Sequence, residues 1–277
     1  MTTEIACKDA VFHFNKHHLV DPATPPWTIK TGGKTYYVNH VECNLPWSTK
    51  ETPDNATLCT ALFKRGLRNQ FIQNVRPVQA QPQPMVGEAF TLRYIPARED
   101  LNPISVFLDH AHPQRAAVET CPPGAVLVID SRKDARAASA GGILVSRLMK
   151  RGVAGVVTDG GFRDSPDIAQ MAIPAYHSRP SAPTNLTLHQ AIDMNLPIAC
   201  GDVAVFPGDV VVGDAEGVVV LPAHLAEALS IEAVEMTAFE DFVSERVMAG
   251  QSILGLYPPT DDSNRLAFEA WRRETNR

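Results

Sequence analysis

The amino-acid sequence predicts a mixed α/β fold in which a layered β-core is flanked by helices. A helix lies between two strands in residues 140–158, as in chains whose strands and helices alternate around one core. Two further strands are each entered through a Pro-Gly turn, at 123–130 and 207–214. A long glutamate-rich segment at 223–249 has the length and composition of a helix. These observations place strands in a compact core and helices around it.

Length and local composition divide the chain into three parts. A chain of 277 residues with 44% hydrophobic residues can bury a large core, and we expect one large domain with additions. Residues 1–53 are rich in proline and glycine and form an N-terminal extension, residues 54–250 form the central domain, and residues 251–277 form a C-terminal tail. We expect the tail, which carries Trp271, to pack on a partner subunit.

The N-terminal extension has one predicted strand or strand pair, at 34–43. A segment with so few regular patterns is not expected to fold alone, and we expect it to pack on the core or across a subunit boundary. A metal site on its clustered histidines is conceivable, although histidines near a terminus are usually unliganded. The aromatic anchors are Trp27, Tyr36, Tyr37 and Trp47, and the clustered histidines are His13, His17 and His18.

The first half of the central domain has regular patterns. Asp54 or Asn55 can cap a helix that ends at Gly66, and the proline-rich residues 75–84 are expected to be a loop. Residues 88–96 alternate as in a strand. A helix is predicted over 103–121, ending at Cys121-Pro122, with His110 and His112 as ordinary polar residues.

The sequence lacks the motifs of two common classes of enzyme. The loop after the strand at Ala125–Asp130 contains no G-x-G-x-x-G, so no nucleotide cofactor is indicated. A serine hydrolase is not expected either, because the chain has no G-x-S-x-G nucleophile turn. The second Pro-Gly strand leads into a hairpin turn at Asp214–Gly217.

Residues 140–164 contain the candidate site. Gly141-Gly142 opens an amphipathic helix that ends at Arg151-Gly152, and the strand 155–158 follows. The chain then reads Asp-Gly-Gly-Phe-Arg-Asp over 159–164, where we expect the paired glycines to let the backbone turn sharply and to place a guanidinium beside a carboxylate. We expect chemistry at this strand end.

Three features of this stretch suit a 2-oxo acid. The backbone amides of Gly141, Gly142, Ile143 and Leu144 lie at a helix N-terminus, which attracts a carboxylate. Arg163 can bind a carboxylate bidentately, and Asp164 offers hard oxygen to Mg²⁺ or Mn²⁺. Singly, a glycine pair is usually a turn and an Arg-Asp pair a solvated ion pair, so the prediction rests on their combination. His177, Ser178 and Arg179 could line the rim, or they form a solvated loop beside Pro180.

The run GGILVSRLMKRGVAGVVTDGGFRD, followed by PIACGDVAVFPGDVVVGDAEGVVVLP, resembles the RraA-like family over about Asp54–Gly250. That family includes metal-dependent aldolases of the 4-hydroxy-4-methyl-2-oxoglutarate type, oxaloacetate decarboxylases and regulators of a bacterial RNA-degrading endonuclease. The resemblance implies a swivelling β/β/α core and a homotrimer or homohexamer with sites at subunit boundaries. It also implies that Asp164 lies at the metal, that Arg163 contacts substrate and that the Gly141–Leu144 amides bind the 2-oxo acid.

The resemblance further implies that a glutamate from a neighbouring subunit's C-terminal helix reaches the active-site water. Glu240 or Glu235 is the candidate. The expected function is a class II, metal-dependent lyase that cleaves a 4-hydroxy-2-oxo acid, or decarboxylates oxaloacetate, to give pyruvate. Two alternatives stay open, namely a non-catalytic regulator that binds the RNA-degrading machinery and another lyase or dehydratase of sugar-acid breakdown.

The net charge and the cysteine content limit the expected partners and the expected cellular compartment. The formal net charge is −6 with a pI of about 5.8 and no long basic stretch, so direct binding of nucleic acid is not expected. The five cysteines are widely separated without a C-x-x-C pair, which is typical of reduced thiols in a cytoplasmic protein. We expect neither an export signal nor a membrane span, because no apolar h-region and no 18-residue apolar run occurs.

Overall fold

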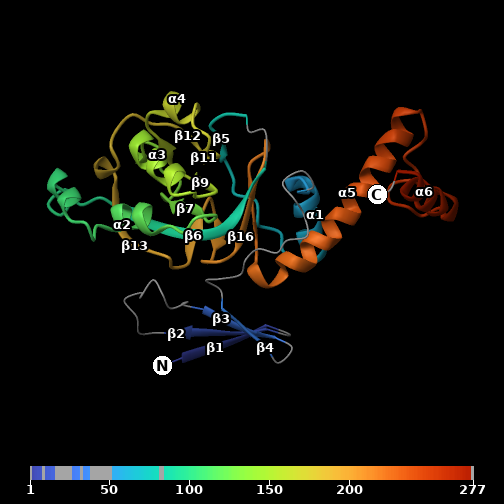
Figure 1. The fold of residues 1–277 in the computed structure, drawn as a ribbon, viewed down its shortest axis with the longest axis horizontal. Coiled ribbons are helices and arrows are strands. Elements are labelled where there is room, and N and C mark those ends of the chain that lie inside the picture. The colour runs from blue at the N-terminus through green and yellow to red at the C-terminus, as the bar shows by residue number, and fades with distance from the viewer. Residues whose placement is uncertain are drawn as a thin grey trace.

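The strand β6 (Met85–Pro96) organises the central domain of the computed structural model (Figure 1). Its first half pairs antiparallel with β16 (Val210–Gly213), and its second half pairs parallel with β7 (Val126–Asp130) and antiparallel with β13 (His189–Met194). Buried and half-buried residues alternate along it, as predicted, and the strand begins three residues before the predicted start at residue 88.

The main sheet has the order β17-β16-β6-β7-β9-β11-β5 and mixes parallel with antiparallel pairs. Residues 70–78 nearly close it, because the Ile72 amide donates to Val218 at one edge (2.8 Å) and the Val78 amide donates to Ala175 at the other (2.8 Å). The predicted α/β core is therefore confirmed as a nearly closed mixed sheet. The strands not yet bounded are β5 (Arg76–Pro77), β9 (Gly155–Thr158), β11 (Ala175–His177) and β17 (Val218–Leu221).

Helices cover the outside of this sheet, and apolar side chains fill it. One buried cluster joins the β7–β9 region to α2 and α3, a second fills the interior between β6, β9, β14 and β17, and a third lies under α1 and α5. The helices are α1 (Asn55–Lys64), α2 (Pro113–Thr120), α3 (Gly142–Lys150), α4 (Ser165–Ile168), α5 (Ala226–Met248) and α6 (Asp262–Thr275).

The remaining elements are short. They comprise the strands β8 (Ala138–Ala140), β10 (Gly161–Phe162), β12 (Arg179–Pro180), β14 (Ile198–Cys200) and β15 (Val203–Val205), and the 3-10 turns η1 (Ile104–Leu108), η2 (Asn185–Thr187) and η3 (Ala223–Leu225).

Helix boundaries follow the predicted caps, with one correction. The Asp54 carboxylate accepts from the Thr57 amide (2.7 Å) and caps α1, and Gly66 follows its end in the left-handed region (φ 81°). The single helix predicted over 103–121 is wrong, because two elements, η1 and α2, occupy that range. The physical reason is Pro113, which lacks an amide hydrogen and suits the first turn of a helix rather than its interior.

The two Pro-Gly turns produce equivalent strands, as predicted. Gly124 (φ 79°) and Gly208 (φ 86°) both adopt the left-handed conformation just before β7 and β16. Both strands then pair with β6. The predicted hairpin is also confirmed, because the Asp214 amide donates to Gly217 (3.0 Å) between β16 and β17.

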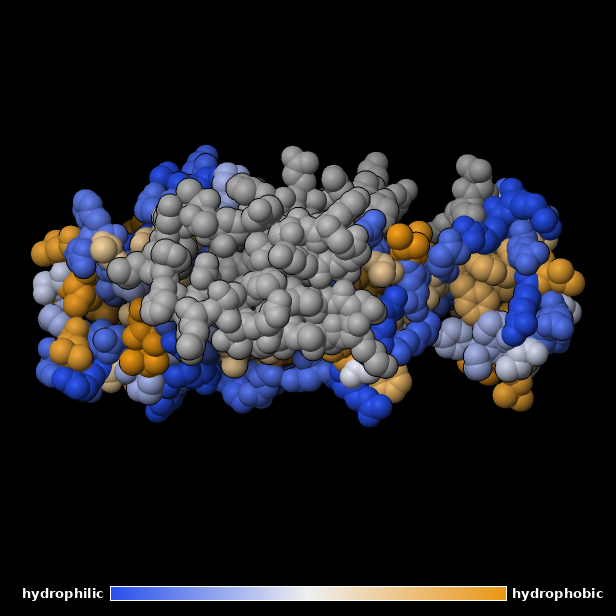
Figure 2. Space-filling view, turned by 90° about the horizontal axis from the view of Figure 1, so that it is seen from below, coloured by the Kyte–Doolittle hydropathy of each residue, from blue (hydrophilic) through white to orange (hydrophobic). Residues whose placement is uncertain are grey.

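The C-terminal helices extend away from the sheet (Figure 1). Trp271 of α6 packs on Phe242 of α5, with ring centroids 5.9 Å apart, so the tail folds back on its own chain. Apolar residues are exposed at this end of the molecule (Figure 2), among them Met248, Leu254 and Leu266. No helix in the described part of the chain is long and apolar enough to cross a membrane.

The structure describes residues 2–7, 10–15, 27–31, 34–37, 52–80 and 84–275. In the N-terminal extension, β1 (Thr2–Cys7), β2 (Ala10–Asn15), β3 (Trp27–Thr31) and β4 (Lys34–Tyr37) form an antiparallel sheet in sequence order. The sequence indicated only a strand or strand pair at 34–43, and β4 occupies the first four residues of that range. The predictions for His17, His18 and Trp47 lie outside the described residues, as do those for the side chains of His13, Trp27, Tyr36 and Tyr37.

Candidate functional site

Two short parallel strands bring the Gly-Gly and Arg-Asp motifs together. β8 leads into Gly141 and α3, and β10 leads into Arg163 and Asp164. Phe162 lies in register with Ala140, and the Arg163 amide donates to the Ala140 carbonyl (3.1 Å). Motifs that are about 22 residues apart in the sequence therefore become neighbours at one sheet end.

The Arg-Asp pair lies directly against both glycines, and at Gly141 it leaves no room for a side chain. A Cβ atom on Gly141 would lie 2.6 Å from Cγ of Arg163 and 3.0 Å from Oδ2 of Asp164. A Cβ atom on Gly142 would meet Cβ of Asp164 at 3.3 Å, a tight but tolerable contact. The Gly142 amide donates to Oδ2 of Asp164 (3.0 Å), which ties the start of α3 to the end of β10.

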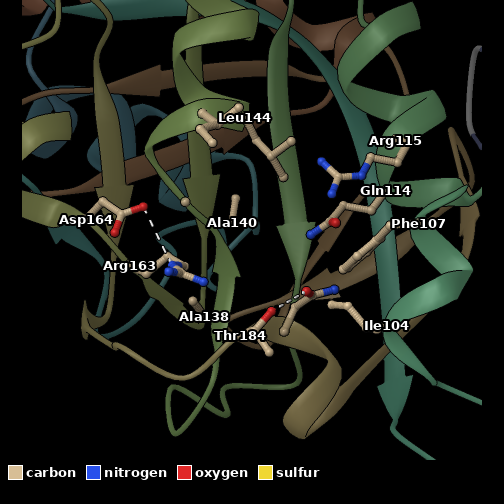
Figure 3. A pocket seen from close by; sticks show the side chains of 13 residues that line it. Ile104, Phe107, Gln114, Arg115, Ala138, Ala140, Leu144, Arg163, Asp164 and Thr184 are labelled. Atoms are coloured by element: carbon tan, nitrogen blue, oxygen red, sulfur yellow. Dashed lines mark hydrogen bonds and ion pairs between the residues drawn. The ribbon is translucent and has the colours of Figure 1, made fainter.

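Asp164 has a strained backbone and an accessible carboxylate. Its φ of 57° lies in the left-handed region that non-glycine residues seldom adopt. Its side chain is 40% exposed, and Nε of Arg163 lies 3.6 Å from its Oδ2. Both side chains face the same pocket (Figure 3). Such strain is common where a binding site holds a side chain in position.

The backbone bends at Asp159 and Gly160, as expected, but the bend does not depend on a positive φ at either glycine. Neither residue has a positive φ among the backbone conformations of the described chain. The two glycines instead allow close packing, because a Cβ on Gly160 would lie 2.6 Å from Cβ of Ser131 and a Cβ on Gly161 would lie 2.6 Å from Cβ of Ser181. They let β10 approach the neighbouring loops.

The N-terminal amides of α3 are only partly free for an anion. The Leu144 amide donates to the Gly141 carbonyl (3.0 Å), and the Gly142 amide is used by Asp164. The Ile143 amide has no acceptor among the described residues. The expected four-amide cradle is thus reduced, because the chain itself satisfies two of the four donors.

These motifs line a pocket of about 300 Å³ whose size suits a small organic acid. The sequence did not indicate several of its residues, because η1, α2 and the segment around η2 reach the pocket only through tertiary packing. The pocket-lining residues that the sequence analysis missed include Ile104, Phe107, Gln114, Arg115, Thr184 and Asn185.

The expected rim residues lie elsewhere. None of His177, Ser178 and Arg179 lines this pocket. His177 is buried and stacks on Phe162, with ring centroids 5.6 Å apart. Burial lowers the pKa of His177 to about 4, so its imidazole is neutral near pH 7.

The candidate glutamates do not reach the pocket of their own chain. Glu240 accepts hydrogen bonds from the hydroxyls of Thr57 (3.0 Å) and Tyr257 (3.1 Å). Glu235 forms an ion pair with Arg272 (2.6 Å). The expectation that Glu240 of a neighbouring subunit completes the site therefore stays a prediction.

The donor set fits a hard divalent cation held mainly by water and substrate. No group of three or more His, Cys, Asp or Glu side chains converges to hold a metal in the described ranges. Asp164 lines the pocket, and its Oδ1 atom makes no bond to another described residue. Mg²⁺ and Mn²⁺ are often held by one or two carboxylates together with waters and substrate oxygens, so Asp164 could hold either ion.

Comparison with known sequences gives a family match and several relatives. The model of the RraA-like family, described as Aldolase/RraA, matches residues 55–220. A protein of Halalkalibacterium halodurans with the name "Putative 4-hydroxy-4-methyl-2-oxoglutarate aldolase" is 32% identical over 136 residues, covering 48% of this chain and 64% of that protein. A protein of the same name from Ectopseudomonas mendocina is 33% identical over 103 residues, covering 37% and 63%. The chain thus matches less than two thirds of the length of these relatives.

Solved structures share the fold. Streptomyces coelicolor RraAS2, described as an unusual member of the RNase ES inhibitor RraA protein family, has a TM-score of 0.61 and 27% identity, with coverage of 71% of this chain and 98% of that chain. A protein from Pseudomonas syringae has a TM-score of 0.63 and 22% identity, with coverage of 76% and 96%, and shows the same architecture.

Proposed function

Because this chain belongs to the RraA-like family, we propose that it is a divalent-metal-dependent carbon–carbon lyase that cleaves a 4-hydroxy-2-oxo acid, or decarboxylates oxaloacetate, to give pyruvate. The observation that carries the proposal is the packing of Gly141 and Gly142 against Arg163 and Asp164 at one pocket. This packing supplies an anion-binding guanidinium, a hard carboxylate and a free helix amide within one small volume.

Different residues of the pocket have different roles in the proposed reaction. Arg163 and the Ile143 amide bind and orient the 1-carboxylate of the 2-oxo acid. A divalent cation at Asp164, when bound, supplies the positive charge that stabilises the developing enolate. Ile104, Phe107 and Leu144 form an apolar part of the pocket wall beside these groups.

Proton transfer requires a base that the pocket of a single chain does not supply. We assign this role to Glu240 of a neighbouring subunit in a homotrimer or homohexamer. Among the described residues, the Glu240 carboxylate accepts from two hydroxyls and forms no ion pair. In retro-aldol cleavage it would draw the proton from the 4-hydroxyl, directly or through a water.

A second candidate function is supported by one structural neighbour. The likeness to RraAS2, whose description names an RNase inhibitor family, favours a regulator that binds a partner protein and turns over no substrate. The retained Gly-Gly and Arg-Asp packing favours the lyase, because a protein-binding surface does not need an accessible carboxylate in a strained conformation.

The test is a screen of 4-hydroxy-2-oxo acids and oxaloacetate with Mg²⁺ or Mn²⁺, in which pyruvate is measured. Asp164→Asn should abolish metal-dependent pyruvate release while the fold is kept, since Asn tolerates the left-handed backbone and can still accept from the Gly142 amide. Asp167→Asn, at an exposed residue outside the pocket, is the matched control and should remain active. Full activity of metal-saturated Asp164→Asn would exclude the mechanism.

A further inference from the structure

A second guanidinium lies across the pocket from Arg163. Arg115 comes from the first turn of α2, an element separate from the two motif strands. In Figure 3, Arg115 and Arg163 lie on opposite sides of the floor that Ala138 and Ala140 form. The pocket therefore has a cationic group at each end.

Arg115 has no carboxylate partner within the described part of the chain. Its Cζ atom lies 4.4 Å from the ring centroid of Phe107, which fixes the side chain by a cation–π contact. Arg147, a more exposed arginine, is paired with Glu119 (2.7 Å). Arg115 lines the pocket, so its donors are available to a ligand there.

A buried amide beside the pocket also lacks a partner. Asn185 lines the pocket and is only 6% exposed, and its Nδ2 atom has no acceptor within the described residues. Its Oδ1 atom accepts from the Thr184 hydroxyl (3.3 Å). The amide of Gln114, by contrast, already donates to Tyr94 and to the Ser139 carbonyl (2.9 Å each). Burial of a hydrogen-bond donor without an acceptor costs free energy. The Nδ2 atom of Asn185 is therefore available to an acceptor atom of a ligand.

The pocket wall between the two arginines combines apolar and polar groups. Its apolar part is Phe107, Ile104, Leu144 and the two floor alanines, and its polar part is Gln114, Thr184 and Asn185. A molecule with a carboxylate at each end and keto or hydroxyl groups between them would match this distribution. A monocarboxylic acid would leave the Arg115 guanidinium without an anionic partner.

We propose that Arg115 binds the distal carboxylate of a 2-oxo dicarboxylic acid whose 1-carboxylate lies at Arg163, so that the pocket selects dicarboxylic over monocarboxylic substrates. The proposal rests on the lyase function above. With 4-hydroxy-2-oxoglutarate, the C3–C4 bond breaks, the 4-hydroxyl loses its proton, and C3 gains one. The products are pyruvate and glyoxylate, and the carboxylate at Arg115 leaves with the glyoxylate.

Turnover is tested with two substrates that differ only at the distal group, namely 4-hydroxy-2-oxoglutarate and 4-hydroxy-2-oxopentanoate, in which a methyl replaces the carboxylate. Arg115→Gln should lower kcat/KM for the dicarboxylate by about 10- to 100-fold, the usual effect of losing a charged hydrogen bond, and leave the value for the methyl analogue unchanged. For the dicarboxylate, the kcat/KM of Arg115→Lys should lie between the values of the wild type and Arg115→Gln. Arg147→Gln should match the wild type on both substrates. Equal losses on both substrates, or no loss, would overturn the proposal.

Ligand binding separates this proposal from the lyase function. If the wild type releases no pyruvate from any substrate, calorimetry with 2-oxoglutarate and 2-oxopentanoate in the presence of Mg²⁺ still tests Arg115. The wild type should bind 2-oxoglutarate at least about tenfold more tightly, and Arg115→Gln should bind the two acids equally. Equal Kd values in the wild type would refute the role of Arg115. Circular dichroism and thermal melting confirm that each variant is folded.

Discussion

At the scale of single residues, the site depends on how closely two glycines approach two charged side chains. Gly141 tolerates no Cβ atom beside Cγ of Arg163, whereas the Cβ of an alanine at position 142 would only touch Asp164. Neither glycine has a positive φ, so backbone strain plays no part in this difference. The two positions therefore form a matched pair of substitutions.

Gly141→Ala should displace Arg163 and lower kcat/KM for pyruvate release by at least about tenfold, with a loss of about 1–3 kcal/mol in the free energy of unfolding from overpacking. Gly142→Ala should retain most activity and most stability, because its new Cβ meets Asp164 at 3.3 Å and alanine favours the helix. Kinetics and urea denaturation measure both effects. Similar activities of the two variants would show that Arg163 does not need its present position.

His177 predicts a pH dependence of stability. Its pKa is lowered to about 4 by burial, against about 6.5 in the unfolded chain. Between these values the unfolded state binds a proton that the folded state does not, so the free energy of unfolding falls as the pH drops from about 6.5 to about 4. His177→Phe, which keeps the stack on Phe162, should remove a loss of about 2 kcal/mol over this range. Denaturation curves at about pH 4.5, within this range, and at about pH 7.5, above it, test this prediction. Parallel pH profiles of the wild type and the variant would contradict it.

At the scale of elements, α6 is held by a small core of its own. Trp271, Phe242, Val243 and Leu256 form a buried cluster that is separate from the three clusters of the central domain. The Trp271 indole also donates to Glu245 of α5 (2.8 Å). A helix held by so few buried groups is expected to open without unfolding of the main sheet.

Trp271→Ala should therefore release α6 locally. We expect amide hydrogen exchange to rise throughout Asp262–Thr275 while β6 and β7 stay protected, because the lost packing of about 3–5 kcal/mol belongs to the separate cluster. Trp271→Phe keeps an aromatic ring in the cluster and loses the hydrogen bond and part of the ring surface, so its effect should be smaller, about 1–2 kcal/mol. Increased exchange in β6 would show that α6 and the sheet unfold together.

At the scale of the whole molecule, exposed apolar side chains lie at both ends of the long axis (Figure 2). Ile104 and Leu108 are 73% and 81% exposed beside the pocket, and Met248 and Leu254 are 87% and 85% exposed at the C-terminal helices. Apolar groups gathered in this way usually mark contact surfaces. They support the proposed homotrimer or homohexamer and a pocket at a subunit boundary.

The N-terminal extension should contribute to the same assembly. Its β1–β4 sheet is small, and four short strands bury little apolar surface alone. Deletion of residues 1–50 should weaken assembly and lower turnover together. Analytical ultracentrifugation with an activity assay on the truncated chain measures both properties. An unchanged oligomeric mass with unchanged turnover would show that the extension is dispensable.

The sequence by itself determined the local elements whose causes are local. The Asp54 cap, the two Pro-Gly strand entries and the alternation along β6 depend on neighbouring residues, and the structure has each of them, with β6 longer at its start than predicted. The Gly-Gly and Arg-Asp motifs were recognisable for the same reason, since each is a short run with its own chemistry.

Only the tertiary structure decided which distant groups share the pocket. The sequence predicted one helix over 103–121, and the break before Pro113 turns Arg115 toward the pocket opposite Arg163. The role of the Gly160-Gly161 pair likewise depends on the serines packed against it and not on its own φ angles. Local patterns report backbone preferences, whereas the approach of side chains from separate elements depends on how the sheet closes and the helices pack on it.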